Sequence, residues 1–575
     1  MDWTRKIVAV ALTLLGVLPG LAQAQATDGQ VIVDASPAGR RQVIDGFGTT
    51  LNPRAAEPWY QALLLDDLRV SIARMDMSPR FAAPYSDAYY HAPSFDGPIH
   101  FPGADNNNVR TYTGPSDYGR LYGSTGAPIA VMGPNIDENV KMFNFDDPRP
   151  ATAGRFSRVA QSKRGALGDY KLFGTVFSPA PWLKIASGNV INAEGDRFPP
   201  ANTPFPFIWN GNFSGGALDI SDRPLEVFND GTGPTSALTQ YARSTAAYLR
   251  GFQISQGVKV YALSIQNELG FEQFYDSCGY PRANQLAAAL KSLRRELSKY
   301  PDLAQIRLIG PEDLLIDSPY SLWQFGSSAS PVHKNVRYLH ELRASDPEAL
   351  AALDFIAVHG EPQEQAWRWF ARGWSATPQG TLPARIDGFT AYGRKSWMTE
   401  TSGSESVWPR PGATAESGAL QVAINIHRAL TVGEQSAWLH WQLEDGTPSN
   451  VFTLTDRAQG ASAPKYVAAK HFFRSIRPNA VRVEATQDAA AGLHVSAYVH
   501  DANRTVTVVL INASASPRTT GIDVRGLSSA GRVWSSATSG PDVSYQTGTP
   551  EVVSGRPQVT IPAFGIVTLQ SVEQS

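Results

Sequence analysis

The chain has 575 residues, of which 42% are hydrophobic and 10% aromatic, with one cysteine and a formal net charge of -2. A chain of this length exceeds one ordinary hydrophobic core, so we expect two domains. The near-neutral charge argues against nucleic acid as the main partner, and a single cysteine excludes an internal disulfide.

The N-terminus has the pattern of an export signal. Two basic residues, Arg5 and Lys6, precede an apolar run over residues 7–18, and Ala22-Gln-Ala24 supplies the small residues of a cleavage site. The run is too short to span a bilayer, and no later stretch reaches about 18 apolar residues. We therefore expect residues 1–24 to be removed near Ala24, and the mature protein to be secreted or periplasmic without a membrane span.

Eight strand-like runs follow, and each tends to finish in polar or aromatic residues. Helical patterns over 237–253, 282–300 and 415–430 separate several of them. Repeated strand–helix alternation predicts a parallel sheet of the α/β class, and eight units favour a (β/α)₈ TIM barrel over an open doubly wound sheet. The runs cover residues 44–52, 68–77, 171–182, 260–268, 306–313, 355–361, 396–402 and 436–445.

Two irregular insertions account for the unusual length of the predicted barrel, residues 44–462. Segments 78–168 and 185–236 are rich in glycine, proline, asparagine and aromatic residues. Both follow strands, and the loops after barrel strands form the catalytic face. We expect them to form walls of a substrate cleft, with surface decoration as the alternative.

The C-terminal part has a different texture. From residue 463 to 575 short β-rich runs are separated by turn signals such as Asp501-Ala-Asn503, which predicts an all-β sandwich domain. Residues 25–43 contain another strand-like run, over 30–35, that could join this domain from the other end of the chain.

Two glutamates carry the functional signal. Glu268 ends the fourth predicted strand and Glu400 the seventh, each among small polar residues. A glutamate at such a position cannot help the core, because burying an unpaired carboxylate is costly. Two of them at strand ends suggest an acid and a nucleophile that face one substrate, as in a glycosidase. For either glutamate alone, an ordinary ion pair or a helix cap is the alternative.

Short motifs along the chain resemble those of glycoside hydrolase family 30, whose members have a (β/α)₈ barrel with a β-sandwich attached by both termini. Their order and spacing carry the resemblance more than any single motif does. The motifs are Ile44-Asp-Gly-Phe-Gly48, Ser178-Pro-Ala-Pro-Trp-Leu-Lys184, Ser264-Ile-Gln-Asn-Glu268, Trp397-Met-Thr-Glu-Thr-Ser402 and Trp438-Leu-His-Trp-Gln442.

The resemblance implies a retaining mechanism. Glu400 would attack the anomeric carbon, and Glu268 would protonate the leaving oxygen and then deprotonate a water molecule. Arg74 would keep Glu400 ionised, with an ordinary salt bridge as the alternative, and Asn267 would hold the sugar 2-hydroxyl. Two tryptophans would form a subsite, although a core position is the alternative for each. The implied substrate-binding residues are Arg74, Trp182, Asn267, His359 and Trp441.

Departures from the family pattern leave the substrate open. Leu269 stands where proline is common, Glu361 where tyrosine is usual, and the end of the eighth strand lacks the nearby arginine of a glucuronate-reading xylanase. We favour an endo-acting hydrolase of β-1,6-galactan or β-1,6-glucan. The alternatives are a xylanase, a glucosylceramidase-like exo-β-glycosidase, and a non-catalytic carbohydrate-binding protein on a decayed barrel.

Motifs for other chemistries do not occur. The sequence has no G-x-S-x-G, H-E-x-x-H, P-loop or dinucleotide fingerprint. Glycosyl transfer to water needs only two carboxylates, so we expect no metal and no cofactor. We expect a monomer whose partner is a polysaccharide or oligosaccharide.

Overall fold

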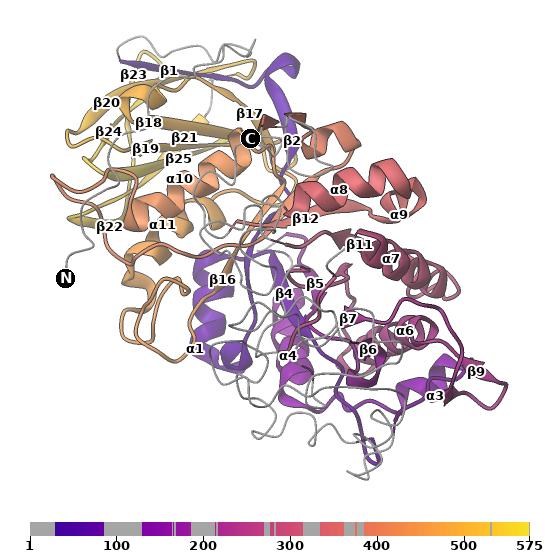
Figure 1. The fold of residues 1–575 in the computed structure, drawn as a ribbon. Coiled ribbons are helices and arrows are strands. Elements are labelled where there is room, and N and C mark those ends of the chain that lie inside the picture. Colours follow the sequence, from indigo (N-terminus) through magenta and orange to yellow (C-terminus); the bar gives the residue numbers. More distant parts are fainter. Residues whose placement is uncertain are drawn as a thin grey trace, which may run out of the picture.

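The structure, a computed structural model, describes most of the chain from residue 29 onward (Figure 1). The expected signal, residues 1–24, and Glu361 lie outside the described residues. The described residues are 29–85, 129–163, 165, 168–185, 213, 217–269, 276–280, 283–313, 334–360, 374–375, 385–528 and 532–573.

Eight parallel strands close into a barrel in the order in which they occur along the chain. The last strand pairs with the first, with Leu439 opposite Gly48. A Cβ atom at Gly48 would lie 1.7 Å from the Ile72 carbonyl oxygen, so the close approach of the first two strands requires glycine there. The predicted fold class is confirmed. The strands are β3 (Gly46–Thr50), β4 (Ile72–Met77), β5 (Lys171–Val176), β10 (Ala262–Ser264), β11 (Arg307–Gly310), β12 (Phe355–His359), β15 (Ser396–Glu400) and β16 (Ala437–Gln442).

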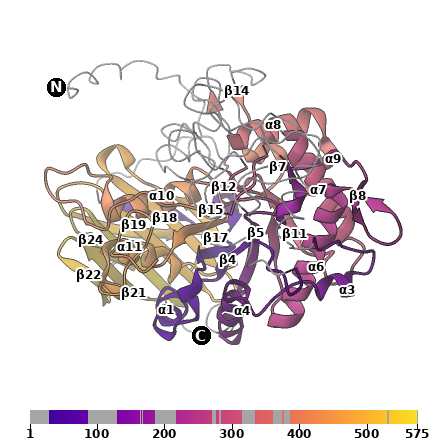
Figure 2. The same ribbon diagram turned by 60° about the horizontal axis from the view of Figure 1, so that its bottom comes forward.

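Helices surround the barrel on its outer side (Figure 2). Among the described residues, no helix is long and apolar enough to cross a membrane. The helices are α1 (Pro58–Gln61), α3 (Ile136–Val140), α4 (Pro148–Ser162), α6 (Ala237–Gln256), α7 (Ala283–Leu297), α8 (Lys334–Ser345), α9 (Pro347–Ala352), α10 (Gly418–Thr431) and α11 (Pro464–Phe473). Three two-stranded sheets pair β6 (Lys184–Ile185) with β7 (Ala217–Leu218), β8 (Leu225–Asn229) with β9 (Pro234–Thr235), and β13 (Trp374–Ser375) with β14 (Arg385–Ile386).

The predicted insertion 78–168 is not irregular throughout, because it contains α3 and α4. The side chain of Asp147 accepts a hydrogen bond from the Arg149 backbone N–H at 3.1 Å, and Pro148 occupies the first turn. Both features favour a helix start. This start places Arg149 at the mouth of the barrel.

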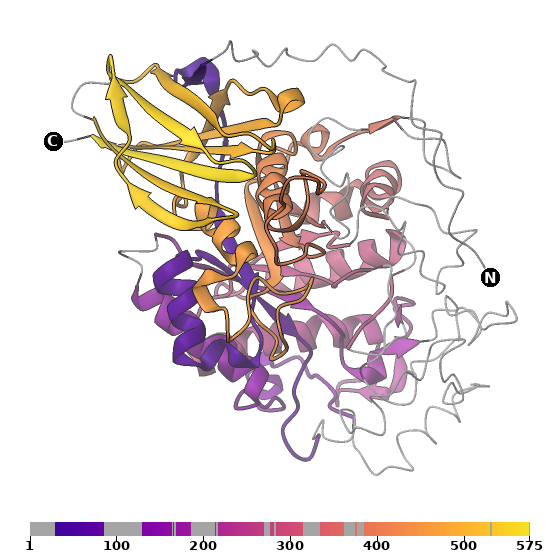
Figure 3. The same ribbon diagram turned by 90° about the vertical axis from the view of Figure 1, so that its left-hand side faces the viewer.

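The second body is an eleven-stranded, mostly antiparallel sheet (Figure 3). β1 lies inside it, parallel to β20 and antiparallel to β17, so the N-terminal strand is part of this body. Val31 and Ile522 from one side share an apolar core with Val508 and Leu569 from the other, which makes a two-layered sandwich. The strands are β1 (Gln30–Asp34), β2 (Arg40–Val43), β17 (Val481–Ala485), β18 (Leu493–His500), β19 (Thr505–Asn512), β20 (Arg518–Arg525), β21 (Arg532–Gly540), β22 (Val543–Gly548), β23 (Glu551–Val553), β24 (Arg556–Ile561) and β25 (Gly565–Glu573).

The sandwich strands of the C-terminal part begin at Val481, not at residue 463, because α11 intervenes. Its buried residues surround the helix instead of forming one stripe, which hides the helical period. The buried ring of His471 contacts Thr568 Oγ1 through Nδ1 at 2.8 Å and Ser539 Oγ through Nε2 at 2.7 Å. The Tyr466 hydroxyl donates to Asp67 at 2.7 Å. Helix α11 therefore joins the sandwich to the barrel.

Candidate active site

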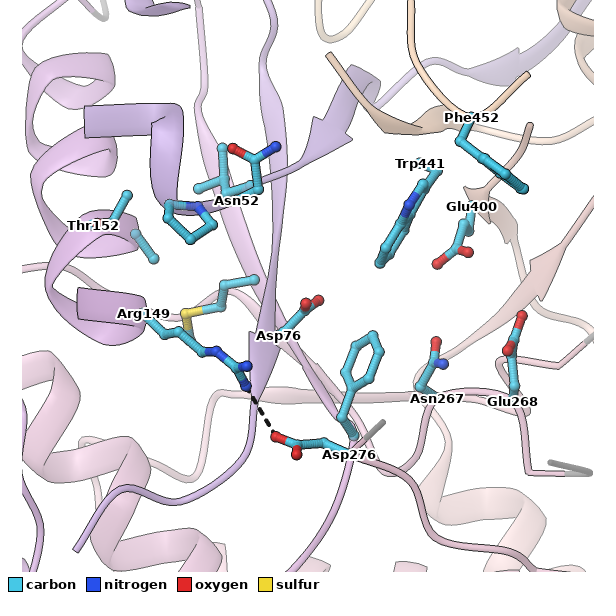
Figure 4. Close-up of a pocket in the computed structure, with 15 residues that line it drawn as sticks. Asn52, Asp76, Arg149, Thr152, Asn267, Glu268, Asp276, Glu400, Trp441 and Phe452 are labelled. Carbon is cyan, nitrogen blue, oxygen red and sulfur yellow. Dashed lines mark hydrogen bonds and ion pairs between the residues drawn. The ribbon is translucent and has the colours of Figure 1, made fainter. Parts of the chain in front are cut away.

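A cavity of about 600 Å³ opens at the carboxyl ends of the barrel strands (Figure 4). Its size is typical of a small-molecule site. The cavity brings together four of the predicted residues, Asn267, Glu268, Glu400 and Trp441. The other described residues that line it are Leu51, Asn52, Pro53, Met75, Asp76, Arg149, Thr152, Ala153, Phe177, Asp276 and Phe452.

Glu400 is the last residue of β15, and its side chain is 9% exposed. Arg74 Nη1 donates a hydrogen bond to Glu400 Oε2 from β4. The guanidinium of Arg74 is fully buried, and neighbouring carboxylates raise its pKa although burial alone would lower it. A permanently charged arginine in this position stabilises an ionised Glu400.

Glu268 lies just beyond β10 in a left-handed backbone conformation, with φ at 45°. Its N–H donates to the Glu312 carbonyl oxygen at 2.6 Å, while the Asn267 N–H donates to the Val176 carbonyl oxygen at 2.7 Å. These two bonds attach the turn to the strands on either side. A non-glycine residue in this region is uncommon and costs free energy, which the surrounding structure must offset.

Asn267 is oriented by the same arginine. Arg74 Nη2 donates to Asn267 Oδ1 at 2.5 Å, so the amide nitrogen is the atom left to donate toward a ligand. The predicted contact with a sugar hydroxyl is compatible with this arrangement.

His359 does not line the cavity but lies buried behind the two glutamates. Its Nδ1 is 3.1 Å from Glu268 Oε1, and its Nε2 is 3.3 Å from Glu312 Oε1. Burial alone would lower the pKa of His359, but Glu400, Glu268 and Glu312 outweigh it and raise that pKa well above the usual value. The ring is therefore an imidazolium that orients carboxylates.

Glu312, just after β11, is a buried carboxylate that the sequence interpretation missed. It forms an ion pair with Arg74 Nε at 3.1 Å and accepts a hydrogen bond from Thr175 Oγ1 at 2.8 Å. Burial would raise its pKa, but Arg74 first and His359 second lower the pKa of Glu312 to about 2. The available signal was the one used for Glu268, an acid just beyond a barrel strand.

Three of these groups come close enough to hold a metal ion. One ligand atom from each of Glu268, His359 and Glu400 lies within 4.8 Å of the others. A metal bound there would displace a proton from His359 and lie beside the Arg74 guanidinium. Since these two cations already neutralise the carboxylates, the arrangement suits a hydrogen-bonded acid cluster better than a metal centre.

The two predicted tryptophans differ in their placement. Trp441, on β16, lines the cavity, and its ring centroid lies 5.8 Å from the Arg74 guanidinium carbon. Trp182 is 1% exposed and packs on Phe81 with ring centroids 4.9 Å apart. It does not line the cavity, because the turn after β5 directs it into the core. Trp182 is therefore a core residue, which was the alternative to a subsite position, and of the two tryptophans only Trp441 faces the site.

The far end of the cavity carries three charged residues that the sequence interpretation also missed. Arg149 Nη1 and Asp276 Oδ2 form an ion pair at 2.9 Å (Figure 4). Burial raises the pKa of the nearby Asp76 carboxyl to about 6. Arg149 begins a helix and Asp276 lies between β10 and α7, so neither position had a strand-end signal.

Curated proteins match this chain over about half of its length. No family model matches the chain. Glucuronoxylanase XynC of Bacillus subtilis (strain 168) is 24% identical over 304 residues, which cover 50% of this chain and 57% of that protein. The chain thus spans little more than half the length of this curated relative.

Solved structures extend the likeness over the barrel and the sandwich. The catalytic domain of the glycoside hydrolase family 30 xylanase C from Talaromyces cellulolyticus has a TM-score of 0.58 at 17% identity, covering 94% of this chain and 100% of that one. The resemblance to glycoside hydrolase family 30 is confirmed. The structure of an endo-β1,6-glucanase is also similar to this chain, with a TM-score of 0.55 at 14% identity over 96% of each chain.

Proposed function

We propose that this chain is an exported, retaining β-glycoside hydrolase with Glu400 as the nucleophile and Glu268 as the acid/base. The observation that carries the proposal is the proximity of the two carboxylates, which have oxygens within 4.8 Å of each other. Retaining enzymes place these groups about 5–5.5 Å apart, whereas inverting enzymes need about 6.5–9.5 Å to admit water.

In the first step Glu400 Oε attacks the anomeric carbon as the bond to the leaving oxygen breaks. Glu268 donates its proton to that oxygen, and a glycosyl ester of Glu400 forms. In the second step Glu268 accepts a proton from water, the hydroxide attacks the same carbon, and Glu400 departs as a carboxylate. Asn267 would donate to the sugar 2-hydroxyl in both transition states.

The buried cluster keeps its charge balanced through this cycle. With His359 as an imidazolium, two cations face the carboxyl groups of Glu268, Glu312 and Glu400. The cluster is neutral when Glu268 holds a proton. Transfer of that proton to the leaving oxygen coincides with esterification of Glu400, so the cluster is neutral again in the intermediate. This constancy limits the cost of moving a proton in a low-dielectric site.

For the substrate, a β-1,6-linked glucan or galactan cleaved internally is the first candidate. The sequence at the end of β16, Trp441-Gln-Leu-Glu-Asp445, contains no arginine, and a neutral glycan needs none. A xylan is the second candidate, because the sequence match is to a protein named glucuronoxylanase. Export rests on the basic and apolar pattern of residues 1–24, and N-terminal sequencing of the protein from culture medium tests it.

The decisive experiment follows the stereochemistry. Proton NMR of early products should show the β-anomer first, and a 2-fluoro glycosyl donor with a good leaving group should label Glu400. Early α-anomer, or a label on Glu361, would overturn the assignment. A panel of purified polysaccharides identifies the linkage, and binding without hydrolysis of any of them would instead support a carbohydrate-binding protein.

A further inference from the structure

The polar end of the cavity is built on the same strand as Arg74. Residues two apart on a strand point to the same face, so Asp76 faces into the barrel one step nearer its mouth than Arg74. Asp76 Oδ1 is buried and has no hydrogen-bond partner among the described residues. A buried carboxylate oxygen without a donor is costly, and a ligand hydroxyl would satisfy it.

The cationic side chains around Asp76 are already paired with carboxylates of the protein. Arg149 is the only cationic side chain among the described residues that line the cavity, and its ion pair with Asp276 takes up much of its charge. Arg80, which is buried, also contacts Asp276, at 3.4 Å. Arg80 also lies 3.7 Å from Asp147, so two guanidinium groups face three carboxylates and leave no net positive charge for an anionic ligand.

These groups lie on the side of the cavity away from the acid. Figure 4 shows Glu268 at one side and Asp76 and Arg149 across the cavity from it. The leaving group must be on the side of Glu268, which protonates its oxygen. A sugar that reaches Asp76 is thus on the glycone side of the bond that is cleaved.

We propose that Asp76, Arg149 and Asp276 form a glycone recognition site that binds the hydroxyl groups of an uncharged sugar and discriminates against uronates. This inference rests on the proposed function, because the role of Glu268 decides which end of the substrate lies at this site. Asp76 accepts a hydrogen bond from a sugar hydroxyl, and Arg149 donates to a neighbouring hydroxyl oxygen while Asp276 holds its guanidinium. A uronate would add a fourth carboxylate around one accessible guanidinium and supply no donor at that position to Asp76.

Binding measurements test the site without relying on turnover. In a Glu400→Gln background, calorimetry compares β-1,6-linked glucose or galactose oligosaccharides with glucuronate-bearing xylo-oligosaccharides. The neutral ligands should bind more tightly, and Asp76→Asn and Arg149→Ala should each weaken them roughly 10- to 100-fold, as for hydrogen bonds to charged groups. Arg295→Ala is the control, because Arg295 is exposed on α7 and does not line the cavity.

Deoxy substrates then separate recognition from a general structural effect. In the wild type, one monodeoxy aryl β-glycoside should lose kcat/KM by a similar factor, and Asp76→Asn should lose no more on that substrate. Tighter binding of the glucuronate-bearing ligand, or equal binding of neutral ligands by Asp76→Asn and wild type, would overturn the inference. Failure of the proposed function has a different signature, since hydrolysis would be absent while neutral sugars still bind.

Discussion

At the scale of single residues, the site depends on one guanidinium. Arg74 contacts Glu400, Asn267 and Glu312, which come from three different strand ends. Arginine presents several donors in a rigid planar fork, so one side chain can fix three groups at once, which lysine cannot do. Because Arg74 is buried, a substitution that removes its guanidinium would leave two carboxylates without their cationic partner.

Glu268→Ala should lose activity according to the leaving group. Without its acid, the protein should hydrolyse natural glycans roughly 10²–10⁴-fold more slowly, whereas aryl glycosides with good leaving groups should keep most of their first-step rate. Steady-state and burst kinetics on both substrate types measure the difference. Equal losses on the two types would remove Glu268 from the acid role.

Asp76→Asn should stabilise the fold at neutral pH while it impairs sugar binding. The folded-state pKa of Asp76 is about 6, above the ordinary value of 3.8, so folding disfavours the ionised form. The contribution of this group to the free energy of unfolding of the wild type is therefore largest below pH 4. It falls by up to about 3 kcal/mol as the pH rises past 6. Asparagine removes this loss.

Urea unfolding of wild type and Asp76→Asn at pH 4 and 7.5 measures the effect. The variant should gain stability relative to wild type only at the higher pH. A gain that is the same at both pH values would show that the titration of Asp76 is not responsible. Arg295→Ala, which changes an exposed charge on α7, should behave like wild type at both.

The sequence identified some of the residues of the site and not others. Glu268 and Glu400 follow directly from polar residues at the ends of apolar runs. Glu312 had the same signal but no family motif to single it out. Asp76, next to the end of the second predicted strand, also had this signal, whereas Arg149 could not be found because only the folded barrel brings a helix start to the cavity.

At the scale of elements, the barrel strands were predictable, whereas several helices, among them α4 and α11, were not. Each strand is a buried run with a sharp polar end, and all eight appear in the predicted order. Helix α11 was not predicted because its buried residues form no amphipathic stripe. Helix α4 was not predicted because the surrounding segment is rich in turn-forming residues. Periodicity identifies elements with one buried face better than elements buried on several sides.

The buried histidine of α11 should make the junction sensitive to acid. Burial lowers the pKa of His471 to about 3, so the unfolded chain binds a proton at a higher pH than the folded protein does. Stability from this group is present above the unfolded pKa of about 6.5 and is lost, by a few kcal/mol, as the pH falls toward 3.

His471→Gln keeps a donor and an acceptor for Thr568 and Ser539 without the titration. Its melting temperature should change less than that of wild type between pH 7 and pH 4. His340→Gln, on the partly exposed surface of α8, serves as the control. An acid response of His471→Gln that matches wild type would place the sensitivity elsewhere.

At the scale of the whole molecule, barrel and sandwich form a continuous structure. Truncation after Ala463 would remove α11 and leave Phe47, which stacks on Phe473 with centroids 5.3 Å apart, exposed to solvent. It would also remove both neighbours of β1. We expect such a protein to be insoluble, measured as soluble yield and hydrolysis rate beside the full chain. A soluble and fully active truncation would contradict this expectation.

The position of β1 has a consequence for how the protein is made. The Ile32 N–H donates to Thr486 Oγ1, 454 residues farther along the chain. At about 5–20 residues per second, synthesis exposes this strand for roughly 20–90 s before that neighbour exists. During that time its two open edges can pair with another nascent chain. The sandwich can close around β1 only after β17 and β20 have been synthesised, so a chain interrupted before them leaves β1 unpaired.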